Sequence, residues 1–365
     1  MKRMRRMGFL ALIMLILASM PFAVYAVDGQ IKIAQTADTT FPIIINKPGS
    51  YVLTSNITVT TPNVHAIEIR ADRVTLDLNG HVIDGPYQGT GKGIYAGNFY
   101  NITIKNGTIT EFQDGIFLEN NSADSKGGDF SIDGIQARRN LGYGIYASYS
   151  TIKNCITNNN DTGIYAKKST INNCSAHHNI NYGIYIEDCV LANSSTNYNR
   201  SYGVWAIRST MVAATSNYNS NGQNSGLGIS AYHCTLEDCV ACYNRLHGIY
   251  AFDSSVKSCT VYNNQNYGIK EYRGTVSNCT ANDNGSAGIS AYYSLISNCT
   301  TYSNTGDGIA VEACVVKGCN VRENSGYGIR DESETSYSYA YRNAVQGNTL
   351  GQIEGVAVHK ENAVW

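Results

Sequence analysis

The sequence is poor in proline and has no excess of charge: 5 of its 365 residues are proline, and its net charge at pH 7 is −1. Because it shows no clustered basic face, nucleic acid is excluded as a partner. No long apolar run follows residue 26, which excludes a membrane-spanning helix in the rest of the chain. Disorder is disfavoured as well, because β-branched and aromatic residues, including 27 tyrosines, are plentiful.

The first residues differ in composition from the rest of the chain. A basic stretch (MKRMRR), an apolar stretch (GFLALIMLILASM) and the small-residue site VYA predict a secretory signal peptide over residues 1–26. Its removal takes away four basic residues and no acidic ones, which leaves 23 basic and 28 acidic residues and a net charge of about −5. We therefore expect a soluble protein that is secreted or periplasmic.

A repeat of 20 residues fills most of the remaining chain. Its marker is a glycine followed by Ile or Val. Successive marker glycines are separated by 20 residues, except for one interval of 19 residues and one of 25. The glycines are Gly144, Gly163, Gly183, Gly203, Gly228, Gly248, Gly268, Gly288, Gly308 and Gly328. Such a regular period predicts a solenoid.

Alignment on this glycine places similar residues in columns. Ile or Val follows one residue later, Ala is frequent at three, an apolar residue stands at eight and Asn stands at sixteen. The alternation within each segment has a period of two, which indicates strands. We predict an all-β parallel β-helix of roughly twelve coils with about 20 residues each. The Asn column is predicted at an inward corner, because Asn tolerates left-handed backbone and its stacked amides can bond along the axis.

The cysteines follow the same columns. Eleven residues after the glycine stand Cys155, Cys174, Cys239, Cys259, Cys279, Cys299 and Cys319, and six after it stand Cys189, Cys234 and Cys314. These positions predict buried free thiols, which behave as small apolar side chains. Neighbouring coils (the rungs of the solenoid) are close enough for an occasional disulfide between cysteines of the same column. Cys242 lies off the columns and is predicted to point outward.

The pattern N-x-x-x-G-I-x-x…S-x-I-x-N-C resembles the parallel β-helix repeat of the right-handed, pectin-lyase-like superfamily. The resemblance covers about residues 64–350, and residues 45–85 are similar to the capping start of many secreted members. It implies right-handed coils, in line with the general crossover rule. We divide the chain into the signal peptide (1–26), a lead-in and cap (27–75), the repeats (76–333) and a C-terminal cap and tail (334–365).

An outward column five residues after the glycine alternates in sign: Lys168, Asp188, Arg208, His233, Asp253 and Arg273. A ladder of cross-strand ion pairs explains the alternation without a ligand. The resemblance implies another role, because lyases of the superfamily hold Ca²⁺ with carboxylates of neighbouring rungs beside an Arg or Lys base. Lys168, Arg208 and Arg273 are then candidate catalytic residues, and Asp188 and Asp253 are candidate Ca²⁺ ligands. No motif implies another cofactor.

Outward aromatic residues run beside this column. They are Tyr146, Tyr165, Tyr185, Trp205 and Tyr250 two residues after the glycine, and Tyr232, Phe252, Tyr272 and Tyr292 four after it. Such residues pack along a strand ladder, or form a platform on which sugar rings lie. The candidate substrate-binding residues are Tyr165, Tyr185, Trp205, Tyr232, His233 and Tyr250.

The predicted function is the binding or lyase-type processing of an acidic polysaccharide or cell-surface glycan along this charged and aromatic face. The signatures DD, GHG and RIK of polygalacturonases, DPH of alginate epimerases and WIDH of pectate lyases are all missing. Catalysis therefore stays open, and an enzyme would be a polysaccharide lyase or a related carbohydrate-active enzyme. The alternative is a non-catalytic, adhesin-like scaffold at the cell surface or in the periplasm. The sequence does not distinguish a monomer from a trimer.

Overall fold

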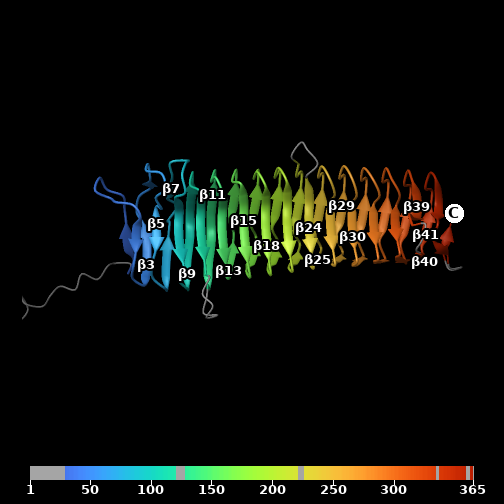
Figure 1. Ribbon diagram of the computed structural model, residues 1–365, viewed down its shortest axis with the longest axis horizontal. Helices are drawn as coiled ribbons and strands as arrows, with labels where there is room; N and C mark the ends of the chain where they lie inside the picture. Colours follow the sequence, from blue (N-terminus) through green and yellow to red (C-terminus); the bar gives the residue numbers. More distant parts are fainter. Residues whose placement is uncertain (1–28, 121–127, 221–225, 334–336, 359–361, 365) are drawn as a thin grey trace, which may run out of the picture.

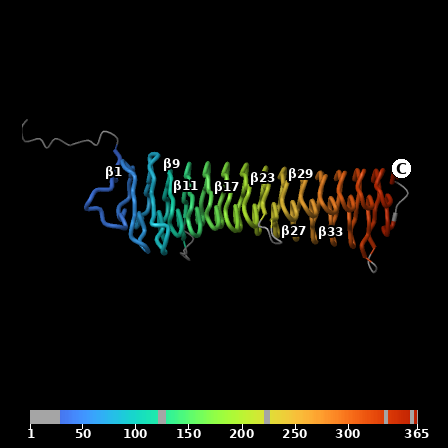
Figure 2. Tube along the Cα trace, turned by 90° about the horizontal axis from the view of Figure 1, so that it is seen from above, coloured from blue at the N-terminus to red at the C-terminus, as the bar shows by residue number. Residues whose placement is uncertain are grey.

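The computed structural model is a long solenoid whose two described ends lie far apart (Figures 1 and 2). The structure describes residues 29–120, 128–220, 226–333, 337–358 and 362–364, so the predicted signal peptide lies outside it. Every regular element in these ranges is a β-strand, and neighbouring strands pair in parallel. No helix of the described part of the chain is long and apolar enough to cross a membrane.

The strands form two sheets, of 15 and 29 strands. The 15-stranded sheet contains β2 (Ile43–Ile45), β5 (Ile67–Ile69), β8 (Lys92–Gly97), β10 (Asp114–Glu119), β12 (Tyr143–Ser148), β15 (Thr162–Lys167), β18 (Tyr182–Glu187), β21 (Tyr202–Ile207), β24 (Leu227–Tyr232), β27 (Ile249–Phe252), β30 (Ile269–Tyr272), β33 (Ile289–Tyr292), β36 (Ile309–Glu312), β39 (Tyr327–Asp331) and β42 (Gly351–Glu354). Its strands follow one another in chain order, one for each coil.

The 29-stranded sheet consists of two rows that share the long strands β9 (Ile102–Thr110) and β11 (Phe130–Arg138). The first row also contains β1 (Ile31–Ile33), β3 (Gly49–Leu53), β6 (Val74–Asp77), β13 (Ser150–Lys153), β16 (Thr170–Asn172), β19 (Val190–Ala192), β22 (Thr210–Val212), β25 (Thr235–Glu237), β28 (Ser255–Lys257), β31 (Thr275–Ser277), β34 (Leu295–Ser297), β37 (Val315–Lys317), β40 (Tyr339–Tyr341) and β43 (Ala357–Val358). The second row contains β4 (Ile57–Thr58), β7 (Val82–Asp84), β14 (Ile156–Asn158), β17 (Ser175–His177), β20 (Ser195–Asn197), β23 (Thr215–Asn217), β26 (Val240–Cys242), β29 (Thr260–Tyr262), β32 (Thr280–Asn282), β35 (Thr300–Tyr302), β38 (Asn320–Arg322), β41 (Ala344–Gln346) and β44 (Ala363–Val364).

The predicted parallel β-helix is therefore confirmed. The 15 strands of the smaller sheet agree roughly with the expected twelve coils. The additional strands come from the two ends of the described chain, where β2 and β5 precede residue 76 and β42 follows residue 333.

Each regular coil turns at single residues in the left-handed region, which stand five, ten and fifteen positions after the repeat glycine. In one coil these are Lys168, Asn173 and His178, with φ of 47°, 52° and 58°. Asn and Asp are frequent there because their short polar side chains make this conformation less costly than it is for other residues. The corners leave three short strands in each coil, with side chains that alternate between the core and the surface.

The glycine column and the asparagine column pack against each other. A Cβ atom on Gly228 would lie 2.6 Å from Asn244 Nδ2 and 2.5 Å from the carbonyl oxygen of Gly248. Asn244 in turn donates from its backbone N–H and from Nδ2 to Asn264 Oδ1, both at 3.0 Å, and from Nδ2 to the carbonyl of Ser216 at 2.9 Å. The repeat therefore requires glycine because the amide ladder occupies the space of a side chain.

The asparagine ladder is continuous along most of the solenoid. Its members are Asn140, Asn160, Asn179, Asn199, Asn219, Asn244, Asn264, Asn284, Asn304, Asn324 and Asn348. The predicted inward position is right, but the predicted left-handed backbone is wrong. Positive φ belongs to the residue before each Asn, such as Tyr243 at 56°.

All eleven cysteines are free and buried, as the column positions predict for ten of them. Cys155 and Cys259 are each 1% exposed, among the Ile and Val side chains of the core. Cys242 stands at an outward position of β26, in register with Asn217 and Tyr262, but its neighbours cover it. It is only 3% exposed, and its Sγ lies 2.8 Å from Asn217 Oδ1.

Candidate functional site

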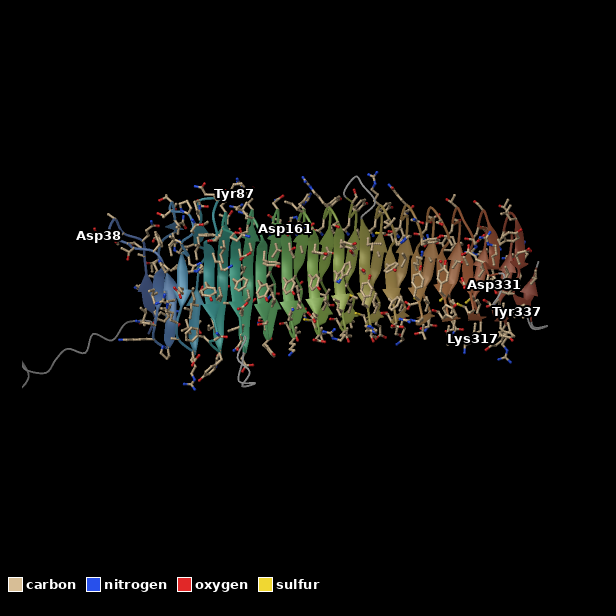
Figure 3. All side chains as sticks on the ribbon, viewed as in Figure 1. Asp38, Tyr87, Asp161, Lys317, Asp331 and Tyr337 are labelled. Atoms are coloured by element: carbon tan, nitrogen blue, oxygen red, sulfur yellow. The ribbon has the colours of Figure 1, made fainter. Side chains whose placement is uncertain are left out.

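A ladder of aromatic side chains runs along the outer surface of the 15-stranded sheet, where rows of side chains follow the solenoid axis (Figure 3). Its regular part is Phe117, Tyr146, Tyr165 and Tyr185, whose neighbouring ring centroids lie 4.3, 4.9 and 4.7 Å apart. The planes of these neighbouring rings differ by at most 10°. Parallel in-register strands bring each ring over the next, which makes the ladder a direct consequence of the 20-residue period.

The stacking differs from the predicted platform in one respect. Because each ring covers the face of its neighbour, a ligand meets the ring edges and the phenol hydroxyls. The hydroxyls of Tyr146 and Tyr185 take part in no hydrogen bond within the described chain. Burial of the rings raises the pKa of both residues, so these hydroxyls stay protonated and can donate hydrogen bonds.

The ladder shifts sideways at Trp205, because the next rung carries Ser230 in place of an aromatic residue. Trp205 stacks on Tyr185 at 6.5 Å and then on Tyr232, four residues after its glycine, at 5.4 Å. The row of ring contacts continues through Phe252, whose plane is tilted by 39° and 38° against those of Tyr232 and Tyr272, and ends in the stacked pair Tyr272 and Tyr292. The structure thus unites Tyr165, Tyr185, Trp205, Tyr232 and Tyr250, five of the six predicted substrate-binding residues.

The alternating charges lie at a corner of the coil, next to this sheet. Asp188, Arg208, His233, Asp253 and Arg273 all have φ between 47° and 60°. Their predicted place in an outward column is therefore refined: they stand at left-handed corners rather than within a strand. Arg273 lies over the ring of Phe252, with Cζ 4.3 Å from the ring centroid. His233 lies 3.7 Å from Asp253.

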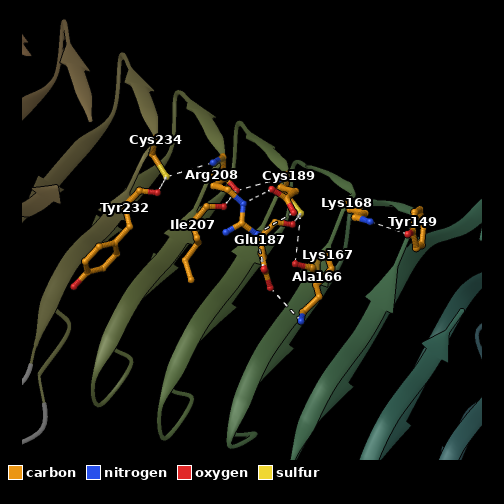
Figure 4. A network of polar contacts seen from close by, with 12 residues as sticks. Tyr149, Ala166, Lys167, Lys168, Glu187, Cys189, Ile207, Arg208, Tyr232 and Cys234 are labelled. Atoms are coloured by element: carbon orange, nitrogen blue, oxygen red, sulfur yellow. Dashed lines mark hydrogen bonds and ion pairs between the residues drawn. The ribbon is translucent and has the colours of Figure 1, made fainter. Parts of the chain in front are cut away.

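Most of these corner side chains form ion pairs. Arg208 contacts Asp188 at 2.7 Å and Glu187 at 2.5 Å, and Glu187 also accepts Lys167 at 3.1 Å (Figure 4). Arg273 pairs with Asp253 through two bonds of 2.9 Å. These pairs agree with the ligand-free explanation of the alternating signs.

The corner cations are poorly suited to act as bases. Hydrogen bonds to Asp188 and Glu187 raise the pKa of Arg208 above its already high value. Lys168 donates to the Tyr149 hydroxyl at 2.9 Å, and this bond raises the pKa of the lysine. A base must lose its proton near the working pH, and both environments oppose that loss. The geometry therefore favours ion pairing for this column, while the base role of Arg273 stays a prediction.

Asp188 and Asp253 do not fit a shared Ca²⁺ site. Their strands β18 and β27 are separated by β21 and β24, so the carboxylates stand three rungs apart, about 14 Å at the usual strand spacing. Each carboxylate is also paired with an arginine. In the ranges that the structure describes, no group of three or more His, Cys, Asp or Glu side chains could hold a metal ion.

Lys168 and Asp188 line a broad hollow of about 700 Å³ on the first row of the 29-stranded sheet. A smaller hollow of about 210 Å³ lies on the aromatic ladder around Ser230. Ser230 and His247 line the smaller hollow and are not among the residues predicted for the site. The signal was present, because Ser230 interrupts the run of aromatic residues that its column holds from Tyr146 to Tyr250.

The corner ion pair leads to a testable expectation. Asp188→Ala should leave the melting temperature within about 2 °C of the parent protein, and the small difference should shrink as salt is added, because exposed ion pairs are screened. Thermal melts at low and high salt would measure this. A large loss of stability, unchanged by salt, would show that Asp188 has a role beyond the pair.

Comparison with known proteins places the chain in a family. The family described as "Right handed beta helix region" matches residues 65–218, 168–275 and 231–363, which together span most of the chain. The protein therefore belongs to the right-handed β-helix family. No curated protein matches the sequence.

Several solved structures are similar over most of this chain. The A-module of the Azotobacter vinelandii mannuronan C-5 epimerase AlgE4 is 15% identical, with a TM-score of 0.41 over 87% of this chain and 91% of that one. The periplasmic alginate epimerase AlgG is 12% identical, with a TM-score of 0.38 over 87% and 77%. The Dettilon tailspike protein is 13% identical, with a TM-score of 0.39 over 89% and 61%. These likenesses are too weak to transfer an activity or a substrate to this chain.

Proposed function

We propose that the protein binds an acidic polysaccharide along the outer surface of the 15-stranded sheet. The observation that carries this proposal is the aromatic ladder, whose regular part offers the same ring edges and hydroxyl groups at Tyr146, Tyr165 and Tyr185. A polymer that runs along the solenoid axis would meet an equivalent surface on these three strands. Aromatic side chains with polar tips provide contact area together with hydrogen bonds, which suits a ligand rich in hydroxyl groups.

The preference for an acidic chain is supported by Lys270 on β30. Its Nζ lies 5.0, 5.5 and 5.9 Å from the ring centroids of Tyr267, Tyr272 and Tyr292. None of the ion pairs in the described part of the chain includes this lysine. An ammonium group without a carboxylate, placed on an aromatic surface, is available to a carboxylate of the ligand.

Binding is favoured over processing by the protonation states on this face. The hydrogen bonds from Arg208 lower the pKa of Glu187 and of Asp188, so both stay ionised and are poor proton donors. A secreted or periplasmic location belongs to the proposal through the predicted signal peptide. A non-catalytic scaffold is the second candidate, because the paired corner charges stabilise a rod without needing a ligand.

The proposal predicts that Tyr185→Ala weakens polysaccharide binding by about tenfold, since it removes one ring from the regular stack. A glycan array followed by titration with the polyuronates that bind would measure the effect. Tyr198→Ala is the matched control, because Tyr198 belongs to a separate stack with Tyr218 at 5.0 Å on the other edge of the coil. Absence of binding to every glycan, or equal binding by both variants, would contradict the proposal.

A further inference from the structure

The hollow around Ser230 contains polar atoms that have no partner in the protein. Ser230 is 0% exposed and His247 is 8% exposed. Ser230 Oγ, His247 Nδ1 and Trp205 Nε1 are all buried without a hydrogen bond in the described structure. All three residues line the same hollow. Unpaired buried polar groups each cost free energy, so three of them around one space indicate a group that supplies the missing bonds.

The hollow exists because a small residue interrupts the aromatic column. Ser230 is the cross-strand neighbour of Trp205 on one side and of Tyr250 on the other. The two aromatic side chains therefore stand on either side of the Ser230 strand, and Tyr232 and His247 also line the hollow. The volume of about 210 Å³ is several times the share of one water molecule, about 30 Å³.

The chemistry of the lining is that of a site for a hydroxylated ring. The Trp205 indole donates one hydrogen bond, and the Ser230 hydroxyl can donate and accept. Burial lowers the pKa of His247 to about 4, so the imidazole is neutral near pH 7 and offers one donor and one acceptor nitrogen. The rings of Trp205 and Tyr250 add apolar contact area for the C–H groups of a sugar ring.

A charge lies one rung further along the sheet. Lys270 is the cross-strand neighbour of Tyr250, and its ammonium group contacts aromatic rings without a carboxylate partner among the described residues. A carboxylate on the bound ring would find its counterion there.

We propose that the Ser230 hollow is a binding site for one uronate ring, held between Trp205 and Tyr250 with its carboxylate toward Lys270. This inference rests on the proposed function, because the ring would be one residue of the polysaccharide that follows the ladder. The proposed site would fix the position of the polysaccharide along the solenoid. A sugar ring can enter the surface at Ser230, where the aromatic column is interrupted, whereas elsewhere it contacts only the edges of the stacked aromatic rings.

The test uses the fluorescence of Trp205. The chain has two tryptophans, so Trp365→Phe in the full-length protein leaves Trp205 as the single reporter. Sodium D-glucuronate and sodium D-galacturonate are titrated in parallel with D-glucose and D-galactose. We expect a saturable change in fluorescence with at least one uronate and a weaker response to its neutral counterpart. Failure of all four sugars to cause a saturable change, as for a hollow that holds only water, would overturn the inference.

Variants of the lining separate this site from the rest of the ladder. Ser230→Tyr restores the aromatic residue of the column, fills the hollow and should abolish the response. Ser230→Ala keeps the space, removes one hydroxyl and should weaken uronate binding by about fivefold to tenfold. Ser230→Ala keeps the test decisive if Ser230→Tyr impairs folding. Lys270→Gln should weaken uronate binding about tenfold and leave the neutral sugars unaffected. A response that survives Ser230→Tyr in a folded protein would place the sugar elsewhere and overturn the inference.

Polysaccharide binding by the same variants distinguishes the two proposals. If a polyuronate binds Ser230→Tyr as tightly as the parent protein, while Tyr185→Ala weakens it, the proposed function stands and the uronate site falls. If both variants weaken the polyuronate and Ser230→Tyr also removes the monosaccharide response, both proposals are supported.

Discussion

Asn244→Leu is expected to lower the free energy of unfolding by about 3–6 kcal/mol, because it leaves several buried polar groups unpaired. The backbone N–H and Nδ2 of Asn219 donate to Asn244 Oδ1 at 3.0 and 2.9 Å and would lose their acceptor. Asn264 Oδ1 and the Ser216 carbonyl would lose donors. All of these groups are in the core, where water does not replace the lost bonds.

Urea denaturation would measure this loss, together with hydrogen exchange of the amides of β23 and β26, since a long solenoid need not unfold in one step. Asn172→Leu is the matched control, because Asn172 is an exposed residue of β16. It should change stability by about 0.5 kcal/mol or less. Equal effects of the two substitutions would contradict the stabilising role of the amide ladder.

The second large effect concerns Glu271, a carboxyl group in the core of the solenoid. It occupies the column three residues after the glycine, where Ala is the usual residue, and it is 0% exposed. Its Oε1 accepts the backbone N–H of Ser254 at 3.3 Å. In neighbouring coils a hydroxyl group takes that position, as when Ser254 Oγ accepts from Cys234 N–H at 3.0 Å. Gly274 provides the space, because a Cβ atom there would lie 2.1 Å from Glu271 Oε1.

Burial raises the pKa of Glu271 from 4.5 to about 8. The unfolded chain releases this proton near pH 4.5, whereas the folded protein keeps it until about pH 8. Between these values the unfolded state binds fewer protons, so stability falls as the pH rises and becomes constant above about pH 8. The whole loss is on the order of 5 kcal/mol, from 1.36 kcal/mol for each unit of pKa difference.

Glu271→Gln should remove this pH dependence, since the amide keeps an acceptor for Ser254 and carries no charge. At pH 5 the variant and the parent should have similar stability, and at pH 9 the variant should be more stable by on the order of 4 kcal/mol. Denaturation curves at several pH values would measure the difference. A parent protein whose stability does not decline relative to Glu271→Gln between pH 5 and pH 9 would show that the carboxyl group is solvated or paired.

The repeat made the core predictable residue by residue. In a parallel coil each position lies over the same position of the next coil, so a column in the alignment is also a row in space. The burial of Cys155 and the inward amide of Asn244 follow from this relation, as does the stacking of Tyr165 on Tyr185. The corner five residues after the glycine was harder to predict, because left-handed positions such as Arg208 and His233 do not carry the preference for Asn and Asp that marks other corners.

The sequence by itself determined the parallel coil, its inward columns and the line of aromatic residues, because all of these depend only on the period. The tertiary structure alone decided how the outward side chains use their space. It showed that stacked rings cover one another's faces, that arginines occupy the carboxylates of Asp188 and Asp253, and that Ser230 opens a hollow with unpaired polar atoms. These features depend on the rotamers of side chains on neighbouring coils and on the distances between them, and the aligned repeats of the sequence do not contain this information.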